Sequence, residues 1–139
     1  MKILFMCIAN SARSQLAEGL AREIFPHAEI ESAGSNPGKL NPFAVQVMNE
    51  IGIDISKHFS KTADNLSPKF LAGLDYVITL CAEEVCPVLP SPTAKKLHWP
   101  FTDPATKEIL PNEEMLRRFR EARDHIHSRL LEFKKELAQ

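Results

Sequence analysis

The sequence lacks the features that would favour contact with a nucleic acid or a membrane. Its 139 residues carry 17 Lys and Arg against 18 Asp and Glu, a formal net charge of -1. No excess positive charge is therefore present to bind a phosphate backbone. No apolar run reaches the roughly 20 residues of a membrane span, and residues 1–7 lack the basic region of a signal peptide. We expect a cytoplasmic, monomeric protein that binds neither nucleic acid nor membrane.

Cysteine is also scarce, because the chain has only Cys7, Cys81 and Cys86. Thiols are kept reduced in the cytosol. A domain of this size buries roughly two thirds of its unfolded surface and folds without disulfides. We therefore expect the three thiols to be catalytic or metal-binding rather than structural.

Short apolar runs predict the strands of a single domain over residues 1–139. Residues 2–7 form a short apolar run typical of a strand buried on both faces, 75–80 are the clearest second buried strand, and 29–32 and 96–99 are shorter candidates. Helical segments separate these runs, which predicts an α/β fold: a four-stranded parallel sheet flanked by helices on both faces. Ligands of such sheets bind at the carboxyl ends of the strands. The loops at those ends follow Cys7, Ser32, Leu80 and Trp99.

The spacing of apolar residues predicts three helices. The first spans residues 16–24 and ends before Pro26. The second begins at Asn41-Pro42, an N-cap acceptor followed by proline, and ends at Gly52. Its predicted buried face consists of Ala44, Val47, Met48 and Ile51. The third is a long amphipathic helix from Asn112, with an apolar face of Leu116, Phe119, Ala122, Ile126, Leu130 and Phe133.

Residues 7–14, directly after the first strand and before the first helix, form a candidate oxyanion site. Their backbone N–H groups, with those of the helix N-terminus, can surround a tetrahedral anion. The guanidinium of Arg13 can bind two of its oxygens. The same positive environment favours the thiolate of Cys7, the form that attacks, and the Ser14 hydroxyl can donate a hydrogen bond to the sulfur. The predicted substrate-binding residues are Ile8, Ala9, Asn10, Ser11, Ala12, Arg13 and Ser14.

This loop contains no glycine, so Asn10 is the residue expected to take a positive φ angle. In the alternative interpretation, Cys7 only ends a buried strand and Arg13 is a solvated residue at a helix start. The position of the motif between a strand and a helix favours the oxyanion site.

The motif Cys7-x-x-Asn10-Ser11-x-Arg13-Ser14 resembles the signature of low-molecular-weight protein tyrosine phosphatases and of the arsenate reductases that share their fold. The resemblance extends from Lys2 into the C-terminal helix, and several motifs are similar to the thioredoxin-coupled arsenate reductase branch. These include Ser32-Ala33-Gly34, Thr79-Leu80-Cys81, Cys86-Pro87 and Asp103-Pro104-Ala105. The family most often has glycine where this chain has Ala9, which we expect to stiffen the loop.

The resemblance implies an enzyme of arsenic detoxification. Arsenate would be its substrate, with phosphate or sulfate as mimics, and thioredoxin or another dithiol its reductant. Cys7 would attack arsenate, Cys81 would then attack Cys7 as arsenite leaves, and Cys86 would attack Cys81. Asp103 would be the general acid that protonates the leaving oxygen. Its alternative role is that of an ordinary turn aspartate before proline.

The electron count explains why a second and a third thiol would be needed. Reducing As(V) to As(III) takes two electrons, which two thiols supply by closing a disulfide, whereas a phosphatase needs only Cys7 and water. If residues 81–86 are helical, the Cα atoms of Cys81 and Cys86 lie roughly 8–9 Å apart. A disulfide spans at most about 7 Å, so this segment would unwind on oxidation.

Several alternatives stay open from the sequence. A phosphatase acting on phosphotyrosine or another phosphomonoester is one, although Ala105-Thr106-Lys107 offers no aromatic side chain to hold a phenol ring. A non-catalytic oxyanion or redox sensor is another. Cys81 and Cys86 could be plain buried thiols, or half of a zinc site with His98.

No cofactor is required by this chemistry, but the resemblance implies a potassium site behind the loop. The matching oxygen ligands are Asn10, Glu18, Ser32 and Asp64. In the alternative interpretation these are solvated polar residues and caps. For the histidines, His58 among them, the sequence supports only a surface or supporting role.

Overall fold

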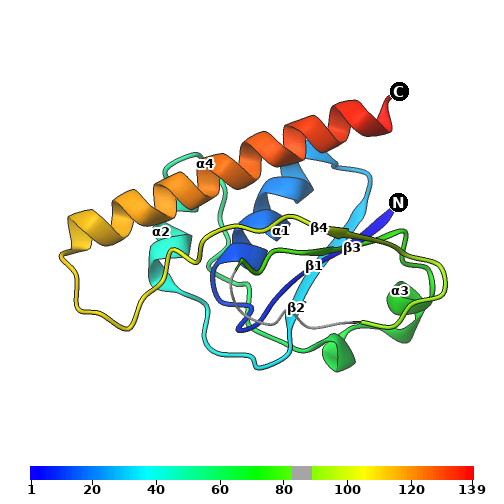
Figure 1. Ribbon diagram of the computed structural model, residues 1–139, viewed down its shortest axis with the longest axis horizontal. Helices are drawn as coiled ribbons and strands as arrows, with labels where there is room; N and C mark the ends of the chain where they lie inside the picture. The colour runs from blue at the N-terminus through cyan, green and yellow to red at the C-terminus, as the bar shows by residue number, and fades with distance from the viewer. Residues whose placement is uncertain (83–88) are drawn as a thin grey trace.

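The described residues, 1–82 and 89–139 of the computed structural model, contain four strands in one sheet (Figure 1). The strands are β1 (Lys2–Cys7), β2 (Glu29–Gly34), β3 (Tyr76–Thr79) and β4 (Lys95–His98). Their order in the sheet is β2-β1-β3-β4, and every neighbouring pair is parallel. The predicted four-stranded parallel sheet is confirmed.

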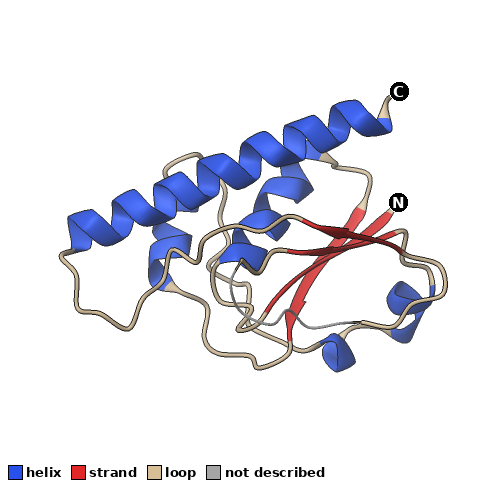
Figure 2. Cartoon of the chain, viewed as in Figure 1, coloured by secondary structure: helices blue, strands red, loops and turns tan. Residues whose placement is uncertain are grey.

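Helices cover both faces of this sheet (Figure 2). On one face lie α1 (Arg13–Ile24), α2 (Pro42–Asn49) and the long α4 (Asn112–Leu137); on the other lie the short 3₁₀ helix η1 (Ala63–Asn65) and α3 (Pro68–Ala72). Strand β1 supplies both cores. Ile3 and Phe5 pack in the core with α1, α2 and α4, whereas Leu4 and Met6 pack with residues of α3 and its flanks. Because alternate residues of a strand point to opposite faces, a doubly covered strand is apolar throughout.

The apolar faces of the helices lie where the sequence predicts, with one exception. All six predicted apolar residues of α4 are buried. In α2, Ala44, Val47 and Met48 are buried, but Ile51 is 45% exposed. The helix ends at Asn49, and Gly52 adopts a φ of 80°. The chain therefore turns before Ile51 could reach the core, and the prediction for this residue was wrong.

The carboxyl ends of the strands meet at one edge of the sheet. The register places Cys7 opposite Gly34, Met6 opposite Thr79 and Thr79 opposite His98. The loops that follow these strands therefore converge, as the sequence predicts. No helix within residues 1–82 or 89–139 combines the length and the apolar character of a membrane span.

Candidate active site

Residues 7–14, called the anion loop from here on, connect β1 to α1. Helix α1 begins at Arg13, and Ala12 at its cap position has no polar side chain that could cap the helix. The amides of the first turn are thus left for an anion, which the helix dipole also favours. Asn10 has a φ of 50°, as predicted for this glycine-free loop. This geometry is suited to an oxyanion, and anion binding by the loop stays a prediction.

Cys7, the predicted nucleophile, is buried and has a hydrogen-bond partner. Its Sγ lies 2.9 Å from the Oγ of Ser14. The amide Nδ2 of Asn10 donates to the same Oγ at 2.7 Å, which leaves the hydroxyl proton of Ser14 available to a Cys7 thiolate. A hydroxyl that donates to sulfur stabilises the thiolate relative to the thiol.

The contact between Ser14 and Cys7 is the last link of a chain of hydrogen bonds that begins at His58. Gln15 donates through Nε2 to the Oδ1 of Asn10 at 3.2 Å, and its Oε1 lies 3.0 Å from the Nδ1 of His58. With the His58 proton on Nδ1, each group from His58 to Ser14 donates to the next. Hydrogen bonds aligned in this way polarise one another.

The side chain of Arg13 contacts the segment of the chain that follows β4. Its Nη1 donates to the carbonyl of Phe101 at 3.0 Å, and its Nη2 lies 3.7 Å from the Oδ2 of Asp103. The other carboxylate oxygen of Asp103 accepts from the N–H of Ala105 at 3.0 Å. Oδ1 thus makes the turn contact expected of an ordinary aspartate before proline, whereas Oδ2 faces Arg13 of the anion loop. The general-acid role of Asp103 stays a prediction.

The close approach of β2 to the anion loop requires a glycine at position 34, which the sequence analysis did not identify. A Cβ atom at this position would lie 2.3 Å from the carbonyl oxygen of Ile8 and 3.0 Å from the amide of Asn10. Any side chain would therefore displace the backbone of the anion loop.

Cys81 follows β3, the strand beside β1, with only Leu80 between them. Leu80 donates its N–H to the carbonyl of Met6 at 2.9 Å, and Cys81 is 1% exposed. Neighbouring strands lie about 4.8 Å apart, so Cys81, whose sulfur is disulfide-bonded in this structure, stands at the same sheet edge as Cys7. Cys86 and the helix expected over 81–86 lie outside the described residues.

The zinc alternative receives no support from the part of the chain that the structure describes. Nδ1 of His98 lies 2.7 Å from the Oγ1 of Thr79. Among the described residues, no group of three or more His, Cys, Asp or Glu side chains is arranged to bind a metal.

The four predicted potassium ligands lie in different environments. Ser32 donates to the Oε1 of Glu18 at 2.6 Å, and both are buried. Asn10 is buried in the anion loop, with its Oδ1 accepting the N–H of Lys61 at 3.0 Å. Asp64 lies exposed in η1. Two of the four, Glu18 and Ser32, are in direct contact.

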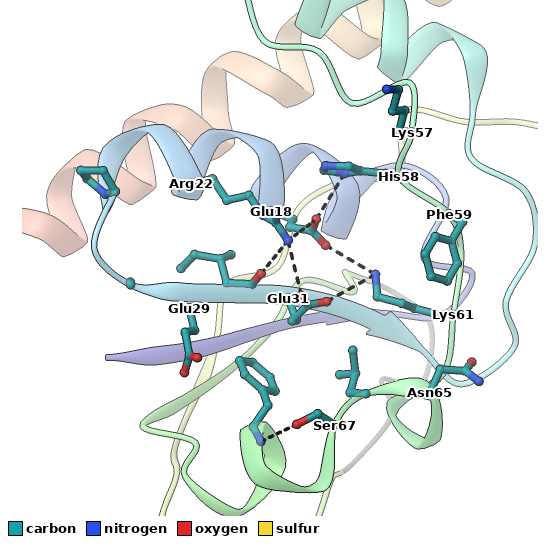
Figure 3. Close-up of a pocket in the computed structure, with 15 residues that line it drawn as sticks. Glu18, Arg22, Glu29, Glu31, Lys57, His58, Phe59, Lys61, Asn65 and Ser67 are labelled. Atoms are coloured by element: carbon teal, nitrogen blue, oxygen red, sulfur yellow. Dashed lines mark hydrogen bonds and ion pairs between the residues drawn. The ribbon is translucent and has the colours of Figure 1, made fainter.

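A cavity of about 780 Å³ adjoins these residues, between α1, β2 and α3 (Figure 3). Glu18 faces it, with Arg22 3.1 Å and His58 3.3 Å from its Oε2. Burial raises the pKa of Glu31 and the charge of Glu18 adds to this, against the opposing effect of Lys61 and Arg22. Burial also lowers the pKa of His58, despite the attraction of Glu18. Of this cluster, only Glu18 and His58 were considered from the sequence, and they were not placed together.

Fold and site together define an α/β protein whose strand-to-helix loop places a buried cysteine beside an arginine at a helix N-terminus. The model of the family "Low molecular weight phosphotyrosine protein phosphatase" matches residues 2–139. The chain belongs to this family. Arsenate reductase 1 of Staphylococcus haemolyticus is 44% identical over 138 residues, which cover 97% of this chain and 96% of that protein.

Solved structures agree with this assignment. One described as an arsenate reductase in the phosphate-binding state has a TM-score of 0.77 and 30% identity, and 98% of each chain is covered. A thioredoxin-dependent arsenate reductase of Corynebacterium glutamicum has a TM-score of 0.71 and 29% identity. The match with it covers 99% of this chain and 63% of that one.

Proposed function

We propose that this chain reduces arsenate to arsenite. The observation that carries the proposal is the buried Cys81 at the sheet edge where Cys7 ends β1. A phosphatase has no use for a second thiol at this place, whereas a reductase needs one. The arsenate reductases named above support the same conclusion, because their similarity extends over nearly the full length of this chain.

Arsenate binds in the anion loop in this proposal. Amides of residues 8–14 and the guanidinium of Arg13 surround its oxygens. Phosphate and sulfate, which share the tetrahedral shape, bind as mimics. The thiolate of Cys7, supported by Ser14, attacks arsenic and forms an As–S bond, and the departing oxygen leaves as water with a proton from Asp103.

The reduction follows as thiol chemistry. The thiolate of Cys81 attacks the sulfur of Cys7 and forms an S–S bond; the electron pair of the As–S bond goes to arsenic, which leaves as As(III). Cys86 then attacks Cys81, which releases the Cys7 thiolate and leaves a Cys81–Cys86 disulfide. Thioredoxin, or another dithiol, reduces that bond. No cofactor takes part, because both electrons come from thiols of the chain.

A phosphomonoesterase is the second candidate, favoured by the family assignment and by the site itself. Cys7, Arg13, Asp103 and water suffice for that reaction. Against a tyrosine phosphatase, residues 105–107 are Ala, Thr and Lys, so no aromatic side chain follows Asp103-Pro104. Weak phosphatase activity is expected of the reductase as well.

Cysteine variants separate the two candidates. Cys86→Ser should release one arsenite per enzyme with thioredoxin present and then stop with Cys7 bonded to Cys81, because nothing in the chain attacks Cys81. Cys81→Ser should release none. Both reduced variants should hydrolyse p-nitrophenyl phosphate like the unmodified protein, and Cys7→Ser should do neither. Mass spectrometry after one turnover identifies the disulfide.

The outcomes that contradict the proposal are equally distinct. Arsenite release by Cys81→Ser at the normal rate would show that the second thiol is not used. Unimpaired multiple turnover by Cys86→Ser would show that the external dithiol attacks Cys81 directly, and the relay of three cysteines would be wrong.

A further inference from the structure

Lys61 is a buried lysine that connects three parts of the site. Its side chain is 7% exposed, and its Nζ lies 3.6 Å from the Oε1 of Glu18 and 3.9 Å from the Oε2 of Glu31 (Figure 3). Its N–H donates to the Oδ1 of Asn10, and its carbonyl accepts the N–H of Gly34 at 2.9 Å. One residue thus contacts the anion loop, the end of β2 and a buried carboxylate.

Glu18 needs a cation close by, because its side chain is 3% exposed. A buried carboxylate without a partner is strongly destabilising. Arg22 and His58 face its Oε2, whereas Oε1 accepts from Ser32 and faces Lys61. Arg22 and Lys61 are two cations that each lie close to both carboxylates, those of Glu18 and Glu31.

This arrangement does not fit a bound potassium ion. An ion held by Glu18 and Ser32 would meet the ammonium of Lys61 beside the same Oε1, and like charges at that distance repel strongly when buried. The pair of cations already balances the two carboxylates. Asp64, the fourth ligand expected from the sequence, lies exposed in η1.

We propose that the ammonium of Lys61 is the built-in cation of this site and makes the protein independent of potassium. It neutralises Glu18 and so holds residues 60–61 against the anion loop. From there Ser60 donates to the carbonyl of Asn10 at 2.7 Å, and Lys61 donates to its side chain. Asn10 in turn orients Ser14 toward the sulfur of Cys7. Lys61 is therefore a positioning residue.

The inference can be tested without arsenate, so its failure would not be confused with failure of the proposed reaction. The proteins compared are the unmodified chain, Lys61→Met, Lys61→Arg and the control Lys57→Met. Lys57 is an exposed lysine that lines the same cavity. Each is measured in potassium chloride and in tetramethylammonium chloride at equal ionic strength. The readouts are the thermal unfolding midpoint and the rate of Cys7 alkylation by iodoacetamide near neutral pH.

In tetramethylammonium, Lys61→Met should unfold about 5 °C lower than the unmodified chain and alkylate about threefold more slowly. Potassium should restore much of both losses in this variant, because a small cation can then approach Glu18. The unmodified chain, Lys57→Met and Lys61→Arg should behave alike in the two salts.

Three results would overturn the inference. One is a potassium effect on the unmodified chain as large as that on Lys61→Met. The second is a Lys61→Met protein that matches the unmodified chain in tetramethylammonium. The third is a Lys61→Met protein that folds in neither salt while Lys61→Arg loses stability in both, because the lysine would then be needed for packing rather than for charge.

Discussion

The anion loop has two sides that differ in exposure. On the side of β4 lie Arg13 and Asp103, and the side chain of Asp103 is 47% exposed. On the side of β2 lie Glu18 and Lys61, and both of their side chains are almost fully buried. The two sides also differ in their contacts. On the β4 side the side chain of Arg13 is buried, and only Asp103, whose Oδ2 lies 3.7 Å from Nη2 of Arg13, is open to solvent. The β2 side is a network in which Ser32, His58 and Lys61 all contact the same carboxylate.

The difference follows from what each side has to do. A group that meets an anion and exchanges protons must be reachable from solvent, and its contacts must be replaceable by those of the substrate. A group that fixes the left-handed Asn10 works best when buried, where hydrogen bonds are stronger and water does not compete. Substitutions on the β4 side should therefore change catalysis, and those on the β2 side should change loop geometry and stability.

The largest effect is expected for Arg13→Lys. An ammonium cannot replace the two hydrogen bonds of a guanidinium, and two such bonds of roughly 2 kcal/mol each correspond to a loss of about 1000-fold in affinity. Titration calorimetry with phosphate and kcat/KM for arsenate measure it. Arg117→Lys, on the exposed face of α4, is the control. Near-normal phosphate binding by Arg13→Lys would contradict the oxyanion site.

The next largest effect is expected for Asp103→Asn. An asparagine Oδ1 can still accept the N–H of Ala105, so the turn is preserved while the acid is removed. The rate of arsenite release should fall about 100-fold, and phosphate affinity should not fall. A normal rate would show that Asp103 is only a turn residue.

The β4 side and the fold were largely predictable from the sequence. Apolar runs and helical spacing are sufficient for β1, β3 and α4, because burial of apolar side chains is what defines them. The anion loop was found because a strand, Cys7, Arg13 and a helix follow one another locally. Cys86 is the exception, because the structure does not describe it and its role stays a prediction.

The β2 side was predictable only in part, because its contacts join residues far apart in the sequence. Glu18 and Ser32 were named, but Lys61 was not singled out, because nothing in its neighbourhood marks a lysine for burial. A missed signal is Ser67-Pro68, which caps α3 just as Asn41-Pro42 caps α2. Identifying α3 would have indicated that the preceding residues pack under the sheet.

A smaller effect, on the nucleophile, is expected for Ser14→Ala. This change removes the hydrogen bond to the sulfur of Cys7 and leaves Nδ2 of Asn10 without its acceptor. A hydrogen bond to a charged group contributes about 1.5 kcal/mol, so alkylation of Cys7 near neutral pH should be about tenfold slower. Ser128→Ala on α4 is the control. An unchanged rate would show that Ser14 does not stabilise the thiolate.

The smallest effect is expected for His58→Gln, and it depends on pH. Burial is the main cause of the lowered pKa of His58; Arg22 and Lys61 add to it, and Glu18 and Asp54 oppose it. A histidine whose pKa is lower in the folded than in the unfolded state takes up protons preferentially on unfolding. Stability is therefore complete above the unfolded value of 6.5 and is lost as the pH falls below it.

Glutamine removes this titration but can still donate to Oε1 of Gln15, the contact that His58 makes. Urea unfolding from about pH 7.5 to about pH 5.5 should therefore show the unmodified chain losing more stability than His58→Gln. The exposed His27→Gln should follow the unmodified chain. If the unmodified chain instead gained stability relative to His58→Gln on acidification, attraction to Glu18 would outweigh burial. The β2 side would then bind a protonated histidine, and His58 would be a third cation beside Arg22 and Lys61.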